Sequence, residues 1–154
     1  MKRWGYWLLA VVTVYAMSGR NFGTDVAELR PVEVVSVSYN DGTIAIRTDT
    51  GDYGMGADLK EAVINLQNTT PAEVFLDTAE YLLIDKDCEP MVQAMVEYLR
   101  PSCGVCVLEG DVEMEMVAQY LRNHKPINTL CKYRAGEKRL QTLRVTKGRM
   151  ELVS

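Results

Sequence analysis

Two short apolar segments in the middle of the chain constrain its fold more than any other feature. Tyr81 to Ile84 (YLLI) and Gly104 to Glu109 (GVCVLE) consist mainly of residues that favour strands buried on both faces. Between them, Pro90 suits the first turn of a helix that runs to about Leu99 and ends before Arg100-Pro101. When a helix separates two buried strands, the strands lie parallel to each other, and the connection between them is a right-handed crossover. The centre of the chain therefore predicts a β-α-β arrangement.

A helix is also predicted on either side of this centre. Asp58 is a good N-cap, and Glu61 three residues later completes a capping-box pair for a helix that ends near Asn68. Asp111 caps the last helix, with Glu113 and Glu115 near its positive end. The spacing of the side chains defines one side of each helix. These sides are Leu59, Ala62, Val63 and Leu66 in the first; Met91, Val92, Met95 and Leu99, predicted to point inward, in the second; and Val117, Tyr120, Leu121 and His124 in the third.

Hairpins are predicted at both ends of the folded region. Pro31 to Tyr39 and Thr43 to Asp49 are strand-like and are joined by Asn40-Asp41-Gly42, a strong turn signal. Leu140 to Val145 and Arg149 to Val153 form the second pair. Val74 to Leu76 is a further strand, and Gly51 to Gly56 reads as a flexible loop. The fold class is therefore α+β (mixed α/β), with a mixed sheet of about five to six strands, three helices and a central β-α-β-α unit.

The N-terminus has the layout of an export signal. Lys2 and Arg3 precede Trp4 to Gly19, a run without charge, and small residues follow. This run is shorter than the ~20 residues that comfortably span a bilayer. Val14 and Ala16 offer a cleavage site, so a cleaved signal and a short uncleaved anchor both remain open. The predicted organisation is a signal or anchor over residues 1–19, a linker over 20–30 and one α/β domain over 31–154, located extracytoplasmically at a membrane or secreted.

The composition of the chain limits the kinds of molecule that it can bind. The chain has 154 residues, of which 47% are hydrophobic and 25% charged, as in an ordinary globular domain. The formal net charge is −4, and the cations near the C-terminus form no dense stripe. A surface that follows phosphates needs a net basic patch, so we predict no nucleic-acid partner.

The four cysteines, Cys88, Cys103, Cys106 and Cys131, allow three interpretations. The CxxC pair Cys103 and Cys106 could carry thiol redox chemistry, but it begins a strand rather than a helix. In an extended segment the two side chains point to opposite faces, where they act as small apolar core residues. In an exported protein the four could also form up to two disulfides. A zinc set that adds His124 lacks the two close ligand pairs typical of such sites.

No other pattern forms a reactive site. His124 is the one histidine and lies at a helix end, where it favours the helix dipole. Gly51, Gly54 and Gly56 lack the Lys-Ser/Thr that ends a phosphate loop. Asp49, Asp52 and Asp58 do not have calcium-loop spacing. We therefore predict a protein that is not an enzyme, with no catalytic, cofactor-binding or metal-binding residues.

Several strings resemble the first domain of the spore germination receptor C-subunit family, Ger(x)C. They are VEVVSVSYNDGTIAI, GADLKEAVINLQNTTP, EVFLDTAEYLLIDKD, the YLR of Tyr98 to Arg100, VCVLEGDVEMEMVAQYL and LRVTKGRMELV. The resemblance covers about Asp25 to Val153 and implies a spore germination (sporulation) protein that acts in a germinant receptor with membrane-protein partners.

The chain departs from this family in two ways. Family members carry a lipid-attachment cysteine directly after the export segment, whereas the first cysteine here is Cys88. Members also continue into further domains after the final hairpin. The chain thus resembles a single-domain or truncated relative that associates with the membrane through Trp4 to Gly19 if this segment stays uncleaved. The alternatives are a generic extracytoplasmic protein-binding module and a thiol oxidoreductase that uses Cys103 and Cys106.

Overall fold

The computed structural model describes residues 30–71, 73–146 and 148–154. The predicted signal or anchor over residues 1–19, and all of the predicted linker except Arg30, lie outside this part. The first described residues, β1 (Arg30–Pro31), pair in parallel with β5 (Val74–Phe75) in a small two-stranded sheet. The predicted strand from Val74 to Leu76 is therefore short, and it lies outside the main sheet.

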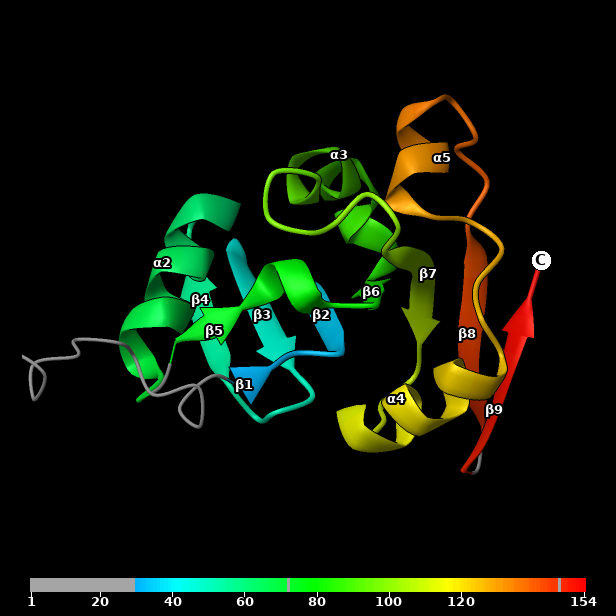
Figure 1. Ribbon diagram of the computed structural model, residues 1–154, viewed down its shortest axis with the longest axis horizontal. Helices are drawn as coiled ribbons and strands as arrows, with labels where there is room; N and C mark the ends of the chain where they lie inside the picture. The colour runs from blue at the N-terminus through cyan, green and yellow to red at the C-terminus, as the bar shows by residue number, and fades with distance from the viewer. Residues whose placement is uncertain (1–29, 72, 147) are drawn as a thin grey trace, which may run out of the picture.

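The main sheet has seven strands in the order β4-β3-β2-β6-β7-β8-β9 (Figure 1). The four central strands, β2 (Val34–Asn40), β6 (Tyr81–Ile84), β7 (Gly104–Glu109) and β8 (Gln141–Thr146), run parallel to one another. β3 (Thr43–Thr48), β4 (Tyr53–Gly56) and β9 (Arg149–Val153) are antiparallel to their neighbours. The predicted mixed fold, with parallel strands at the centre and hairpins at both ends, is confirmed.

The first hairpin forms because its turn residues accept an unusual backbone conformation. Asn40 pairs with Thr43, and Asp41 and Gly42 between them have φ angles of 50° and 81°. Positive φ at both central positions is what a two-residue hairpin turn requires. All four residues of β6 are buried, as the YLLI run predicts for a central strand.

The predicted flexible loop from Gly51 to Gly56 is wrong, because Tyr53–Gly56 forms the edge strand β4. Gly54 and Gly56 face α2 (Leu59–Thr69), where a Cβ atom on either glycine would lie 2.4 Å from the helix backbone at Ala62. These glycines permit close packing of the helix on the strand, a role that the flexible-loop interpretation overlooked.

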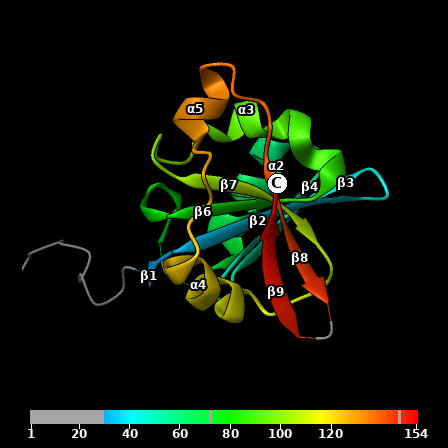
Figure 2. The ribbon, with the colours of Figure 1, turned by 90° about the vertical axis from the view of Figure 1, so that its right-hand side faces the viewer.

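The two faces of the sheet carry unequal numbers of helices. α2, the helical segment η3–α3 (Lys86–Met91 and Val92–Met95) and α5 (Leu130–Arg134) lie on one face, and α4 (Met114–Asn123) lies on the other (Figure 2). The parallel strands follow one another in a single direction across the sheet, and the right-handed crossovers from β2 to β6 and from β6 to β7 both return over the first face. The connection from β7 to β8 differs, because it places α4 on the second face before α5 on the first. This topology fills one face and leaves α4 alone on the other.

The core is divided between these faces by the alternation of the strands. Val35, Ile46, Leu82 and Val105 pack toward α2, α3 and α5. Val34, Leu83, Cys106 and Leu143 pack toward α4, which contributes Val117, Ala118 and Leu121. Because both faces of β6 and of the first part of β7 are covered, these residues are apolar, and the first charge of β7 comes at its exposed end, Glu109.

The first predicted helix is confirmed in its cap and its buried side. Asp58 accepts a hydrogen bond from the Glu61 backbone N–H at 2.8 Å, and Leu59, Ala62, Val63 and Leu66 are buried. The second predicted helix differs, because Lys86–Met91 is a 3₁₀ segment and only Val92–Met95 is α-helical. Val92, Met95 and Leu99 are nevertheless buried, as predicted.

The third predicted helix begins later than expected, and one further helix follows it. The N-cap is Glu113 rather than Asp111, and it makes no side-chain cap hydrogen bond. His124 lies at the C-cap, the helix end that was predicted for it, and is exposed there with its ring stacked on Tyr120 at a centroid distance of 4.3 Å. α5 was not predicted because it is short; Thr129 caps it, and Leu130 and Tyr133 anchor it in the core.

Candidate functional site

Half of the α4 side of the sheet has no helix over it in the part of the chain that the structure describes. Residues paired across β2, β3 and β4 point to the same face, so Ser38 aligns with Ala45 and Met55, and Arg47 aligns with Tyr53. Gly54 and Gly56 alternate with these positions and face α2. Ser38, Ala45, Arg47, Tyr53 and Met55 therefore lie opposite α2, and together they form what we call the open face.

The open face combines aromatic, apolar and cationic side chains. Tyr53 is 41% exposed and Met55 is 45% exposed. The Arg47 guanidinium lies 5.5 Å from the centroid of the Tyr53 ring. This contact holds a cation and an aromatic ring together at the surface without a buried charge. Tyrosine, methionine and arginine are the residues enriched at protein interfaces.

A groove borders the open face where the β3–β4 turn approaches the start of α4. Its volume is about 640 Å³. Arg47 and Tyr53 line one wall, and Val112 and Met114 line the other. Glu113 and Glu115 are exposed residues at the same place. The groove thus combines the apolar groups of Tyr53, Val112 and Met114 with the Arg47 cation on one wall and the carboxylates of Glu113 and Glu115 on the other side. On that acidic side it suits an apolar side chain flanked by cations.

Two carboxylates of the β3–β4 turn hold the groove in shape. The Asp52 carboxylate accepts a hydrogen bond from the Thr50 hydroxyl at 2.6 Å, and the Thr48 hydroxyl accepts one from the Asp52 backbone N–H at 3.1 Å. The Asp49 carboxylate accepts the Glu33 backbone N–H at 3.1 Å. These bonds fix the turn that carries Tyr53, and they assign both aspartates a structural role.

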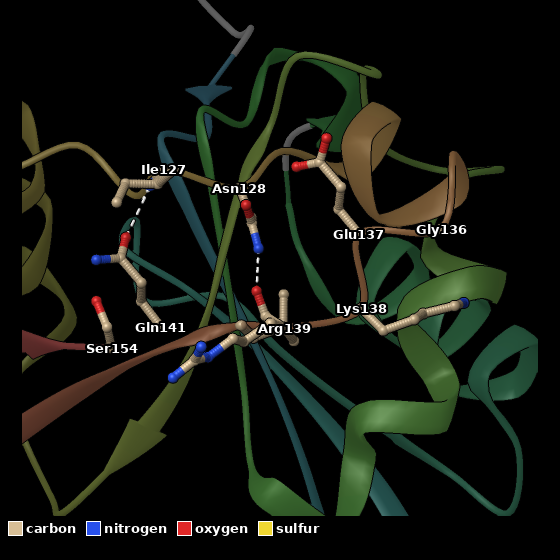
Figure 3. Close-up of a pocket in the computed structure, with 9 residues that line it drawn as sticks. Ile127, Asn128, Gly136, Glu137, Lys138, Arg139, Gln141 and Ser154 are labelled. Carbon is tan, nitrogen blue, oxygen red and sulfur yellow. Dashed lines mark hydrogen bonds between the residues drawn. The ribbon is translucent and has the colours of Figure 1, made fainter.

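A second hollow, of about 550 Å³, lies between the 126–129 segment and the approach to β8 (Figure 3). The Gln141 side-chain oxygen accepts the Ile127 backbone N–H at 2.8 Å, and the Asn128 side chain donates to the Arg139 carbonyl oxygen. The Lys138 ammonium lies 4.1 Å from the Tyr133 ring centroid. Because the polar groups of Gln141 and Asn128 are used to hold the chain together, we assign this hollow a packing role.

The predicted opposite orientation of Cys103 and Cys106 is confirmed. Both side chains are fully buried, Cys103 on the α2 side of the sheet and Cys106 on the α4 side. Burial raises the pKa of each thiol to about 12. A redox cysteine reacts as an exposed thiolate, so this arrangement gives the oxidoreductase alternative no support. All four cysteines are free, and only Cys131 is exposed.

The residues considered for a metal site do not come together. Within ranges 30–71, 73–146 and 148–154, no three side chains of His, Cys, Asp or Glu are placed to hold a metal ion. Asp58 caps α2, and the Nδ1 atom of His124 lies 3.1 Å from the Tyr120 carbonyl oxygen.

Comparisons with known proteins give no relatives. No protein-family model matches the chain, and searches of curated proteins and of solved structures find no significant match. The resemblance to the Ger(x)C family therefore stays a prediction. Among the helices of the described ranges, none has the length and apolar character needed to cross a membrane.

Sequence reasoning missed the open face because it treated Gly51 to Gly56 as a loop. The signal was present in the alternation of Tyr53 and Met55 with Gly54 and Gly56, which has the period of a strand. A strand with glycine on one side packs closely there and carries its larger side chains on the other.

Proposed function

We propose that the chain is a non-enzymatic, membrane-associated extracytoplasmic domain that binds a protein partner through its open face. The observation that carries this proposal is the exposure of Tyr53 and Met55 beside Arg47 on a sheet face that α4 only half covers. Exposed aromatic side chains at the centre of a patch supply most of the binding energy in many interfaces.

The chemistry of the groove indicates the kind of partner segment. An apolar anchor would bury itself between Tyr53 and Met114, while Lys or Arg side chains beside it would meet Glu113 and Glu115. A complementary charge pattern speeds association and excludes acidic partners. The export signal predicted from residues 1–19 supports a partner on the outer side of a membrane.

The resemblance to the Ger(x)C family supports a more specific assembly, a germinant receptor. This proposal is tested by deleting the gene and measuring nutrient-triggered germination. We expect germination to slow, the gene with Tyr53→Ala to fail to restore it, and the gene with Tyr39→Ala to restore it. Tyr39 is a matched control because it is 43% exposed and alternates to the other face of β2.

Unchanged germination after deletion would contradict the germinant-receptor role. The second candidate, a binding module of another exported assembly, would then remain, because it rests on the same open face. It is favoured if crosslinking from Tyr53 captures a partner in vegetative membranes rather than in spores.

A further inference from the structure

The two edges of the main sheet are protected differently. At β4, the Asn65 side-chain oxygen accepts the Met55 backbone N–H at 3.2 Å, and the Thr69 hydroxyl donates to the Tyr53 carbonyl oxygen at 3.1 Å. Side chains of α2 thus occupy the backbone groups that a further strand would use. Edge strands covered in this way do not recruit another chain.

The opposite edge, β9, has no such cover from the residues that the structure describes. The views along and across the sheet show no element beyond β9 (Figures 1 and 2). Across the described ranges, the backbone of Arg149–Val153 makes hydrogen bonds only within its hairpin with β8. Thr146 pairs with Arg149 next to the turn, and the two residues that flank such a turn form a hydrogen-bonded pair. Hydrogen-bonded and non-hydrogen-bonded pairs alternate along an antiparallel ladder, so the backbone N–H and C=O groups of Met150 and Leu152 point away from β8.

Charges alternate in rows that run toward this edge. Glu109, Arg144 and Glu151 are aligned across β7, β8 and β9, and Arg144 Nε donates to the Glu109 carboxylate at 2.8 Å. The neighbouring row ends in Thr146 and Arg149. A polar hollow of about 490 Å³ lies among Arg144, Thr146, Arg149 and Glu151. One row therefore ends in a negative charge and the next in a positive charge.

We propose that β9 is a dimer interface and that its partner is a second copy of this chain. Two β9 strands pair antiparallel about a two-fold axis, with Met150 opposite the partner subunit's Met150. Arg149 then lies opposite the partner subunit's Glu151, and the reverse pair forms on the other side of the axis. The row Glu109, Arg144 and Glu151 continues into a cation, so signs alternate across both subunits.

Charge selects this register over the nearest alternative. Moving one strand by two residues would place Glu151 opposite its own copy, where two like charges destabilise the pair. In the proposed register both faces also match, since Met150 and Leu152 are half-buried on the α4 side while Arg149 and Glu151 are exposed on the other. The open face lies at the far end of the sheet, so the dimer leaves it accessible.

The test is a charge-reversal series in the full chain in mild detergent, with mass measured by analytical ultracentrifugation over a range of concentrations. Arg149→Glu alone and Glu151→Arg alone each create two like-charge pairs, and each should raise the dimer dissociation constant at least about tenfold. Mixing the two single variants should restore dimers as a heterodimer, and so should combining both changes in one chain. Glu137→Arg, an equal change on an exposed loop, is the control and should leave the mass unchanged.

A wild-type chain that stays monomeric at every concentration would overturn the proposal. If Glu151→Arg raises the dimer dissociation constant but Arg149→Glu does not, the proposed register is wrong. Failure of the mixed variants to associate would do the same, while circular dichroism of each variant confirms that it is folded. The result does not depend on the protein partner of the open face, which is tested separately.

Discussion

Two glycines set the distance between β4 and α2. A Cβ atom at Gly54 would lie 2.4 Å from the Ala62 carbonyl oxygen and 2.6 Å from the Leu66 Cβ, and one at Gly56 would meet Ala62 and Glu61. These neighbours are mostly helix backbone, which cannot rotate away as the end of a side chain can. The helix would have to move off the strand, and the open face on the other side of β4 would shift with it.

Gly54→Ala is therefore expected to lower the free energy of unfolding by about 1–3 kcal/mol through overpacking. Gly104→Ala is the matched control, because its added Cβ would meet the nearest atoms at 3.4 Å, an ordinary contact. Urea denaturation of both variants measures the difference. Equal losses at the two positions would contradict the packing that we describe.

The buried thiols link stability to alkaline pH. The pKa of Cys106 is raised to about 12 by burial, whereas an unfolded cysteine ionises near ~8.5. The stabilising contribution is present below about pH 8.5 and decreases as pH rises, because the unfolded chain then releases a proton that the folded chain retains. Replacing Cys106 by Ala should make the decline of unfolding free energy between about pH 9 and 11 shallower by about 1.4 kcal/mol per pH unit. An unchanged slope would show that this thiol is not buried.

At the scale of elements, the two longest helices of the described residues, α2 and α4, differ in how their first turns are held. The Asp58 carboxylate accepts a hydrogen bond from the Glu61 backbone N–H at the start of α2, and the Glu61 carboxylate in turn accepts one from the Ala57 backbone N–H at 2.8 Å. Glu113 occupies the same position in α4 without a cap hydrogen bond. The α2 cap is therefore a local contribution that substitution can isolate.

Asp58→Ala should lower the free energy of unfolding by about 1 kcal/mol, the usual cost of removing an N-cap side chain. Glu113→Ala removes a similar charge near a helix N-terminus but breaks no cap hydrogen bond, so its effect should be smaller. Thermal and urea denaturation of the pair provide the measurement. If the two variants lose the same free energy of unfolding, the stabilising effect of Asp58 comes from its negative charge near the helix N-terminus and not from its cap hydrogen bond.

Elements with strong local signals could be predicted from sequence, and elements defined by tertiary contacts could not. Asp41-Gly42 fixes its hairpin because few other residues accept positive φ, and the apolar run from Tyr81 to Ile84 requires burial on both faces. β4 lies between these cases, because YGMG alternates with the period of a strand, but its pairing with β3 and its packing under α2 are tertiary contacts that the short string does not show. α5 is held mainly by Leu130 and Tyr133 in a core contributed by distant segments.

At the scale of the molecule, strand order determines where function is possible. α2, η3–α3 and α5 cover one face of the sheet, whereas α4 alone lies on the other and covers only part of it. The sequence predicted an exported binding domain in general terms. The net charge argued against a nucleic-acid partner, and the placement of the cysteines in a strand argued against redox chemistry. The sequence could not locate the binding surface, because Arg47, Tyr53 and Met55 become neighbours only through the β3–β4 pairing that the loop interpretation missed.

Site-specific photocrosslinking in cells tests most directly that the open face binds a protein partner. A photoreactive phenylalanine replaces Tyr53 in one strain and Tyr39 in another, which gives the same probe at nearly equal exposure on opposite faces of the sheet. We expect one membrane-associated adduct from position 53, identified by mass spectrometry and lost when Arg47→Glu is added, and no such adduct from position 39. The same adducts from both positions, or none from position 53, would contradict it.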